Sequence, residues 1–300
     1  MTKVLIDTDP GTDDALAMMM ALNSPDLDVL GFTTVGGNAR LADTTRNALR
    51  LLEYLGRTDV PVFRGSARPL RGKFQYAYDV HGAAGLGVRL RSPVTAPHAK
   101  RAPQVIMEMA SVHRGELTVI ALGPLTNIAR ALVLEPRLAA WIKQIVVMGG
   151  AAGVPGNVTP HAEFNIYNDP VAADAVLSSG IPVTLVGLDV TSQTYLTAAA
   201  RPWVRGDSPA ARLSRRILAG SLGPTTGLGR FHLHDPLAVV AAVRPCLFTY
   251  QQAAVAVETA DPGRTGRTVA SYGCGPVAVA VGVDVARAKA MTVELLGASI

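Results

Sequence analysis

The chain has 300 residues, of which 49% are hydrophobic and 17% are charged, and its formal net charge is +5. This composition excludes an intrinsically disordered chain, which requires low hydrophobicity and high charge. Mean hydropathy is +0.26, but no run of about 18 apolar residues occurs, so we expect no membrane association. The basic residues are scattered and aromatic residues make up only 5%, so we expect no nucleic-acid partner.

Two features of the chain indicate a cytoplasmic protein. An aspartate stands at position 7, so the N-terminal segment lacks the apolar core of a signal peptide. Cys246 and Cys274 lie too far apart to form a metal-ligand or redox motif. A reduced compartment is the simplest setting for two such thiols.

Strand-type and helix-type segments alternate through much of the chain. In chain order, the pattern predicts strand 3–8, helix 12–23, strand 28–35, helix 41–55, strand 60–63, loops at 65–97, helix 103–113, strand 117–122, helix 125–134, strand 144–148, a loop at 149–164, helix 170–179, strand 182–187, mostly helix over 192–243, strands 249–257 and 277–283, and helix 285–296. Alternation with nearly all-apolar strands predicts an α/β fold with an open, mostly parallel sheet covered by helices on both faces. We expect one domain over residues 1–300, with extra C-terminal strands at one edge.

Small or oxygen-bearing residues follow several of the predicted strands. They are Asp7-Thr8-Asp9, Val35-Gly36-Gly37-Asn38, Leu122-Gly123 and Met148-Gly149-Gly150. In open α/β sheets, ligands bind outside the carboxyl ends of the strands. The sequence therefore predicts a pocket lined with groups that bind hydroxyls.

The most acidic segment is Asp7-Thr8-Asp9-Pro10-Gly11-Thr12-Asp13-Asp14, which holds four aspartates. Pro10-Gly11 predicts a tight turn, and Asp13 and Asp14 then enter the first turn of a helix, where the macrodipole favours carboxylates. Clustered like charges raise one another's pKa unless positive charge is present, and no Lys or Arg lies between Val4 and Leu30. A hard divalent cation with oxygen ligands, Ca²⁺ or Mg²⁺, would supply that charge. The alternative is a capped helix with a solvated turn.

Other polar residues have two interpretations each. The Asn38 side chain can donate and accept hydrogen bonds, which fits a sugar hydroxyl, but Gly-Gly-Asn is also a common turn sequence. His81 lies in the loop region, where a histidine is usually solvated. Asn157, Glu163 and Asn165 share one apolar, Gly-rich stretch, and they suit either a polyol ligand or a buried loop network.

The segment His234-Asp235-Pro236 precedes an apolar helix. Asp followed by Pro is typical of an N-cap and the first helical position, and Asp169-Pro170 shows the same pattern. The local sequence therefore leaves open whether Asp235 caps the helix or binds a metal. His232 and His234 have His-x-His spacing, but no third soft ligand is nearby, so zinc is not favoured.

The N-terminal segment is also compatible with an alternative hypothesis, a phosphatase. Phosphatases of the haloacid dehalogenase superfamily begin with an apolar strand and Asp-x-Asp-x-Thr/Val, in which the first aspartate is the nucleophile. Asp7 and Asp9 fit this pattern, but Gly11 occupies the Thr/Val position, and the pair Asp13-Asp14 is foreign to it.

Taken together, the motifs resemble the inosine–uridine-preferring nucleoside hydrolase family. The hallmark of that family, Asp-x-Asp-Pro-Gly-x-Asp-Asp, is matched by Asp7–Asp14 at every fixed position. The resemblance continues in the order of the family through Gly37-Asn38, His81-Gly82, Leu122–Asn127, Glu163–Asn165 and His234-Asp235.

The resemblance implies a Rossmann-like α/β domain, a homodimer or homotetramer, and a tightly bound Ca²⁺. By matching positions, the cation ligands would be the carboxylates of Asp9, Asp14 and Asp235 and the main-chain carbonyl of Leu122. The ribose of a ribonucleoside substrate would be held by Asp13, Asn38, Asn157, Glu163 and Asn165. Asp9 would be the general base for a metal-bound water, His234 the acid for the leaving base, with a pKa near neutrality, and His81 a further substrate contact. Asp7 would support the turn.

One segment departs from the family pattern. Relatives place Tyr or Trp near the nucleobase, whereas Ser214–Phe231 contains neither, and Phe231 is its one aromatic residue. The preferred base is therefore left open. A non-catalytic ribose- or nucleoside-binding protein on the same fold is a second hypothesis, against which the intact Asp9 argues.

Overall fold

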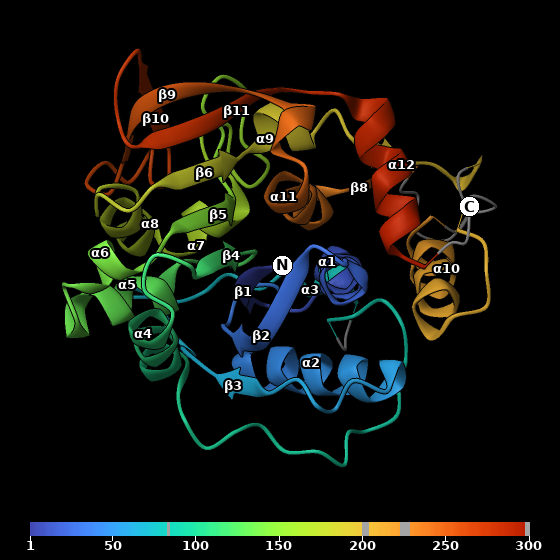
Figure 1. The fold of residues 1–300 in the computed structure, drawn as a ribbon. Coiled ribbons are helices and arrows are strands. Elements are labelled where there is room, and N and C mark those ends of the chain that lie inside the picture. The colour runs from blue at the N-terminus through green and yellow to red at the C-terminus, as the bar shows by residue number, and fades with distance from the viewer. Residues whose placement is uncertain (83–84, 200–203, 223–228, 298–300) are drawn as a thin grey trace.

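A nine-stranded sheet runs through the computed structural model, which describes residues 1–82, 85–199, 204–222 and 229–297 (Figure 1). Its strand order is β10-β9-β11-β6-β5-β4-β1-β2-β3. The strands are β1 (Thr2–Thr8), β2 (Leu27–Thr34), β3 (Val62–Arg64), β4 (Thr118–Ala121), β5 (Gln144–Met148), β6 (Val183–Val186), β9 (Phe248–Val257), β10 (Thr268–Tyr272) and β11 (Val277–Val283). The pairs from β3 across to β6, and β6 with β11, are parallel, whereas β9 pairs antiparallel with β10 and β11. The predicted parallel sheet with extra C-terminal strands is confirmed.

Helices cover both faces of this sheet. The longer ones are α1 (Thr12–Asn23), α2 (Leu41–Leu55), α4 (Ala102–Val112), α5 (Thr126–Leu134), α8 (Pro170–Leu177), α10 (Pro209–Ser221), α11 (His234–Val243) and α12 (Val285–Leu295). There are two apolar cores, one on each face of the sheet. On one face the core includes residues of α4, α5 and α8, and on the other it includes residues of α1, α2, α10, α11 and α12. No helix in the described parts of the chain is long and apolar enough to cross a membrane.

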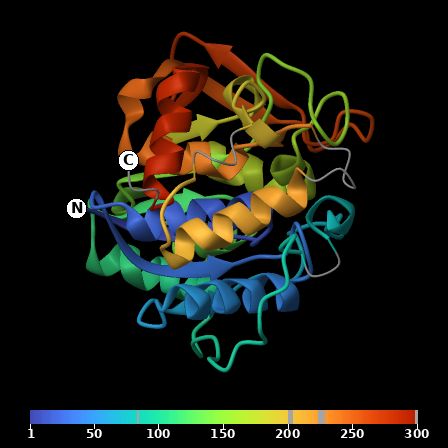
Figure 2. The ribbon, with the colours of Figure 1, turned by 90° about the vertical axis from the view of Figure 1, so that its right-hand side faces the viewer.

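Two of these helices, α1 and α11, are buried on all sides. They pack against each other, and α10 and α12 lie over α1 as a second layer (Figures 1 and 2). Residues Ala15–Ala21 of α1 are completely buried, as are Leu237–Val240 of α11. Because neither helix has a solvent face, their buried segments are apolar all round.

Short elements account for most differences from the sequence-based prediction. The regions expected to be loops contain the single-turn helix α3 (Tyr78–His81) and the start of α7 (Phe164–Asn168). The helices α6 (Leu138–Trp141) and α9 (Leu188–Thr191) were not expected, nor was the two-stranded sheet of β7 (Tyr195–Leu196) and β8 (Phe231–His232) within the region expected to be mostly helical. Residues 200–203 and 223–228 of that region lie outside the described residues. Strand β10 was also missed, because most of its side chains are exposed and it lacks an apolar run.

Candidate active site

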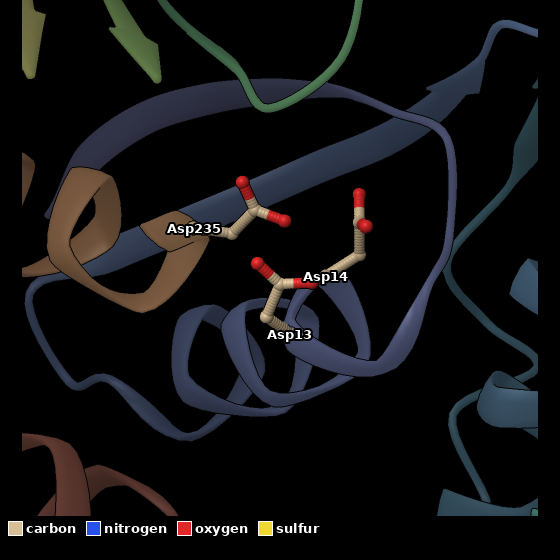
Figure 3. A group of neighbouring side chains, drawn as sticks. All are labelled: Asp13, Asp14 and Asp235. Carbon is tan, nitrogen blue, oxygen red and sulfur yellow. The ribbon is translucent and has the colours of Figure 1, made fainter. Parts of the chain in front are cut away.

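Three carboxylates meet where two helices begin. Asp13 and Asp14 lie in the first turn of α1, and Asp235 is the second residue of α11. One ligand oxygen from each lies within 4.8 Å of the others (Figure 3). Each helix N-terminus carries partial positive charge, so the two ends together favour this gathering of carboxylates.

Hydrogen bonds hold both oxygens of the Asp14 carboxylate. Its Oδ1 accepts from the Thr8 hydroxyl at 2.5 Å, and its Oδ2 accepts from the backbone N–H of Gly11 at 2.9 Å. The side-chain amide of Asn38 also donates to Oδ2 at 2.9 Å. Asn38, which the family resemblance assigns to ribose, therefore also builds the carboxylate site.

Asp9 follows β1 and is completely buried. Its Oδ2 accepts from the backbone N–H of Asn38 at 2.6 Å, whereas its Oδ1 has no hydrogen-bond partner among the described residues. A Cβ atom on Gly37 would lie 2.0 Å from Oδ2, and one on Gly123 would lie 2.4 Å from Oδ1. Both positions therefore require glycine, because any side chain there would collide with this carboxylate.

The electrostatics of the site call for a cation. Burial raises the pKa of Asp9 and Asp235 well above the usual range of a carboxyl group, and it raises the pKa of Asp14 as well. Mutual repulsion adds to each shift, chiefly from Asp14 on Asp9 and from Asp13 on the other two. A bound cation would favour the ionised carboxylates and give the Asp9 Oδ1 a partner. The residues present thus fit an oxygen-ligand metal site.

The Leu122 carbonyl, another expected ligand, follows β4. It accepts the side-chain amide of Asn165 at 2.7 Å, and the same amide lies 3.2 Å from the carbonyl oxygen of Met148. A carbonyl oxygen has two lone pairs, so one remains for a cation. Asn165 therefore ties the ends of β4 and β5 together through its nitrogen.

The loop that follows β5 is organised around Glu163. Its carboxylate is the N-cap of α7, where it accepts from the backbone N–H of Asn165 at 2.9 Å and from that of Gly150 at 3.1 Å. Burial nevertheless raises the pKa of Glu163 to about 7. Asn157 accepts from the first N–H of α7 at 2.9 Å. The polyol-binding and loop-network interpretations are thus compatible, because these side chains order the loop and also line a cavity.

That cavity has a volume of about 270 Å³. Its lining combines oxygen-bearing side chains with a basic and aromatic group. The first group is Asp13, Asn38, Asn157, Glu163, Asn165 and Asp235, and the second is His81, Arg230, Phe231, His232 and His234. All the site residues expected from the sequence line the cavity except Asp9 and Asp14. These two lie in the turn between β1 and α1, and both contact Asn38, which does line the cavity.

Two histidines, His81 and His234, form what we call the imidazole pair. His81 is 7% exposed, so it is not a solvated loop residue. Its Nδ1 accepts the backbone N–H of Thr12 at 3.1 Å. The Nδ1 of His234 lies 2.9 Å from the Thr191 hydroxyl, and the His232 ring stacks on it with centroids 5.3 Å apart.

The charge state of His234 differs from the sequence-based expectation. Burial, together with repulsion from the neighbouring His232 and His81, lowers the pKa of His234 to about 3. The expected pKa near neutrality was therefore wrong, because the expectation took no account of desolvation. The ring is neutral near pH 7 and can act there as a hydrogen-bond donor.

Asp7 does not line the cavity. Its Oδ1 accepts from the Thr33 hydroxyl at 2.5 Å and from the side-chain amide of Asn127 at 2.7 Å, which joins β1 to β2 and α5. Burial raises the pKa of Asp7 to about 7. These contacts agree with a role in supporting the turn, and they remove support for Asp7 as a phosphatase nucleophile.

Sequence reasoning missed several residues of the site. Asp13 was assigned to ribose alone, although its carboxylate belongs to the acidic group. Thr12, Thr191 and the stacked His232 were not assigned roles. No local signal marks the threonines, because their partners lie far away in the chain.

Comparison with known proteins agrees with the geometry. The family model described as inosine-uridine preferring nucleoside hydrolase matches residues 4–290. Uridine nucleosidase 1 of Arabidopsis thaliana is 42% identical over 272 residues, which cover 86% of this chain and 78% of that protein.

Solved structures show the same likeness. A plant nucleoside hydrolase has a TM-score of 0.94 and 39% identity, with 99% of each chain covered. A purine-preferring ribonucleoside hydrolase from Gardnerella vaginalis has a TM-score of 0.91 and 34% identity, with 98% of each chain covered. Sequence, fold and the acidic site thus agree, and the chain belongs to the inosine-uridine preferring nucleoside hydrolase family as a hydrolase of ribonucleosides.

Proposed function

We propose that the protein hydrolyses the N-glycosidic bond of ribonucleosides in a Ca²⁺-dependent reaction, giving ribose and a free nucleobase. The observation that carries this proposal is the buried, unpartnered Oδ1 of Asp9 beside the acidic group at the cavity. A buried carboxylate oxygen without a partner is costly unless a ligand supplies one.

The cation would be held by Asp9, Asp14, Asp235 and the Leu122 carbonyl, and Asp13 is close enough to join them. Carboxylate and carbonyl oxygens without nitrogen or sulfur suit Ca²⁺, which takes about 6–8 oxygen ligands. When bound, the cation supplies positive charge that orients the ribose hydroxyls and makes a nearby water more acidic. Asp13, Asn38, Asn157, Glu163 and Asn165 would hold the ribose.

Asp9 is the proposed general base. The C1′–N bond breaks and its electron pair leaves with the nucleobase, while water adds to C1′ and gives its proton to the Asp9 carboxylate. The sugar carbon becomes positively charged in the transition state, as in other glycoside cleavages. The surrounding carboxylates stabilise that charge electrostatically.

His234 is the proposed contact to the departing nucleobase, with His81 as a second contact. Both rings line the cavity and both are held at Nδ1, which leaves Nε2 to meet the substrate. Because burial keeps the His234 ring neutral, it serves as a hydrogen-bond donor rather than as a charged acid.

The test is a panel of uridine, inosine, cytidine and adenosine, with ribose release measured by a reducing-sugar assay. We expect turnover of at least one of them with Ca²⁺ present, and poor turnover of the matching 2′-deoxynucleoside. Binding of all four without ribose release would overturn the proposal in favour of a non-catalytic nucleoside-binding protein.

Two properties implied by the resemblance belong to the same proposal, namely a homodimer or homotetramer and a cytoplasmic location. Light scattering on the purified protein would measure the oligomer number. A monomeric mass would contradict the first of these.

A further inference from the structure

We propose that Thr191 holds the His234 ring at Nδ1, so that the ring proton lies on Nε2 and is donated in a hydrogen bond to the departing nucleobase. Thr191 is thus a positioning residue for the reaction. This inference rests on the proposed role of His234 at the leaving base.

The first argument concerns the direction of the hydrogen bond. Thr191 is completely buried, and its Oγ1 lies 2.9 Å from the Nδ1 of His234. Among the described residues, the hydroxyl has no other hydrogen-bond partner. A buried hydroxyl proton needs an acceptor, and Nδ1 is the acceptor in reach. The hydroxyl therefore donates, Nδ1 accepts, and the ring proton resides on Nε2.

His81 provides an internal precedent. The backbone N–H of Thr12 donates to its Nδ1 at 3.1 Å, and a backbone amide can only donate. The Thr12 hydroxyl also lies 3.1 Å from this nitrogen. The ring proton of His81 therefore resides on Nε2 as well. A threonine meets Nδ1 of each member of the imidazole pair, although only for His81 does the backbone fix the direction.

The position of Thr191 is rigid. It ends α9, whose Asp189 carboxylate accepts from the backbone N–H groups of Ala152 at 3.0 Å and Gly153 at 2.7 Å. These bonds anchor the single turn of α9 to the loop after β5. Such anchoring is needed because a helix of one turn is not stable by itself.

The position of His234 relative to Thr191 is also fixed by backbone pairing. In the small sheet, Tyr195 of β7 pairs with His232 of β8, and the N–H of Leu233 donates to the carbonyl of Thr194 at 2.9 Å. The His232 ring then stacks on His234 with an angle of 17° between the planes. This stack opposes rotation of the imidazole away from the Thr191 hydroxyl.

The chemistry explains why the tautomer matters. As the C1′–N bond breaks, negative charge develops on the nitrogens and carbonyl oxygens of the base. An Nε2–H donor stabilises that charge, whereas the other tautomer would present a lone pair and repel it. The hydrogen bond moves no proton by itself, and the released base takes its proton from solvent.

The experiment compares Thr191→Val and Thr191→Ser on two substrates. One is uridine or inosine, whichever the wild type cleaves, and the other is para-nitrophenyl riboside, whose leaving phenolate is stable without a donor. Thr191→Val keeps the size of the side chain and removes the hydroxyl, so we expect kcat on the nucleoside to fall about 10- to 100-fold. On the nitrophenyl riboside, kcat should stay within about twofold, since no leaving-group donor is needed. Thr191→Ser should restore most of the nucleoside activity.

His234→Ala separates this inference from the proposed function. It should show the same substrate selectivity as Thr191→Val, with a nucleoside loss at least as large. Full nucleoside activity in His234→Ala would contradict the role of His234, and with it this inference. Equal losses on both substrates in Thr191→Val would show that Thr191 is only structural.

A spectroscopic readout tests the tautomer directly. The ¹⁵N shifts of the His234 ring in histidine-labelled protein should identify Nε2 as the protonated nitrogen. In Thr191→Val that preference should be lost, while Thr12→Val should leave the His81 tautomer in place because the backbone donor remains. A wild-type ring protonated at Nδ1 would overturn the proposal.

Discussion

The carboxylate cluster and the imidazole pair line one cavity, yet they are built in different ways. Most of the carboxylates come from one turn, Asp9–Asp14, and short-range hydrogen bonds from Thr8 and Gly11 orient Asp14. The imidazoles come from α3 and α11, and each is oriented by a residue far away in the chain, Thr12 or Thr191. Local contacts set most of the carboxylate cluster, to which Asn38 and Asp235 are added by tertiary packing, whereas both imidazoles depend on tertiary packing alone.

This difference predicts unequal responses to change. In the proposed mechanism the carboxylates act through their charge, so altering one should remove the reaction or the cation. The imidazoles act through orientation, so altering their supports should tune the rate and leave the cation in place. Four predictions follow this order of decreasing effect.

The largest effect is expected from Asp9→Asn. The amide keeps the shape of the carboxylate but cannot accept the proton of the attacking water, so kcat should fall about a thousandfold. In the cation-free protein the melting temperature should not fall, because the change removes one charge from a group whose members repel one another. Steady-state kinetics and thermal unfolding measure the two quantities, and activity within about tenfold of wild type would exclude Asp9 as the base.

Removal of the cation should come next. Chelation should remove most of the activity, and Ca²⁺ should restore it. In the cation-free protein, Asp9, Asp14 and Asp235 have pKa values raised by burial, so the folded state binds more protons than the unfolded state, and stability falls as pH rises.

Thermal unfolding of the chelated protein measures this dependence. Its melting temperature should be higher at about pH 5 than at about pH 8, and Ca²⁺ should stabilise the protein more at about pH 8. Equal stabilisation at both values would indicate that the cation does not bind these carboxylates.

A smaller loss is expected from Gly123→Ala. The new Cβ would lie 2.4 Å from the Oδ1 of Asp9, so the carboxylate must turn from its present position. We expect Ca²⁺ affinity to fall about tenfold or more, in the range found for disturbed supports of metal ligands. Gly282→Ala is the matched control, since its Cβ would meet Thr249 at an ordinary 3.5 Å. Calcium titration measures the affinity of both variants, and equal affinities would contradict the prediction.

The smallest effect is expected at His232. His232→Phe keeps a flat ring against His234, so kcat on nucleosides should change by only about twofold, whereas His232→Ala removes the stack and should cost several-fold more. Calcium affinity should be unchanged in both variants. A weaker calcium affinity in either variant would show that the imidazoles and the carboxylate cluster do not act separately.

The same division explains what the sequence could reveal. The β1–α1 turn was predictable because its strand, its Pro-Gly turn and its helix-entering aspartates are contiguous, and β1 and α1 agree with the structure to within a residue. The role of Thr191 was not predictable, because a threonine at the end of a single-turn helix carries no local mark. The sheet β7–β8 was missed for a related reason: its two-residue strands are too short for any periodicity. The pKa of His234 also required the fold, since burial sets it.

The second helical layer over α1 and α11 has a consequence for how this family can diversify. The carboxylates begin two helices that are packed on every side, so a change in their placement would disturb the apolar core. Other residues that line the cavity, such as Val80 and Val158, lie outside that core, so they can change at less cost. A protein named for uridine is similar to this chain in sequence, and one named for purine nucleosides is similar in structure. Carboxylates fixed by buried helices, beside lining residues that can change, would allow one reaction to be kept while its substrates change.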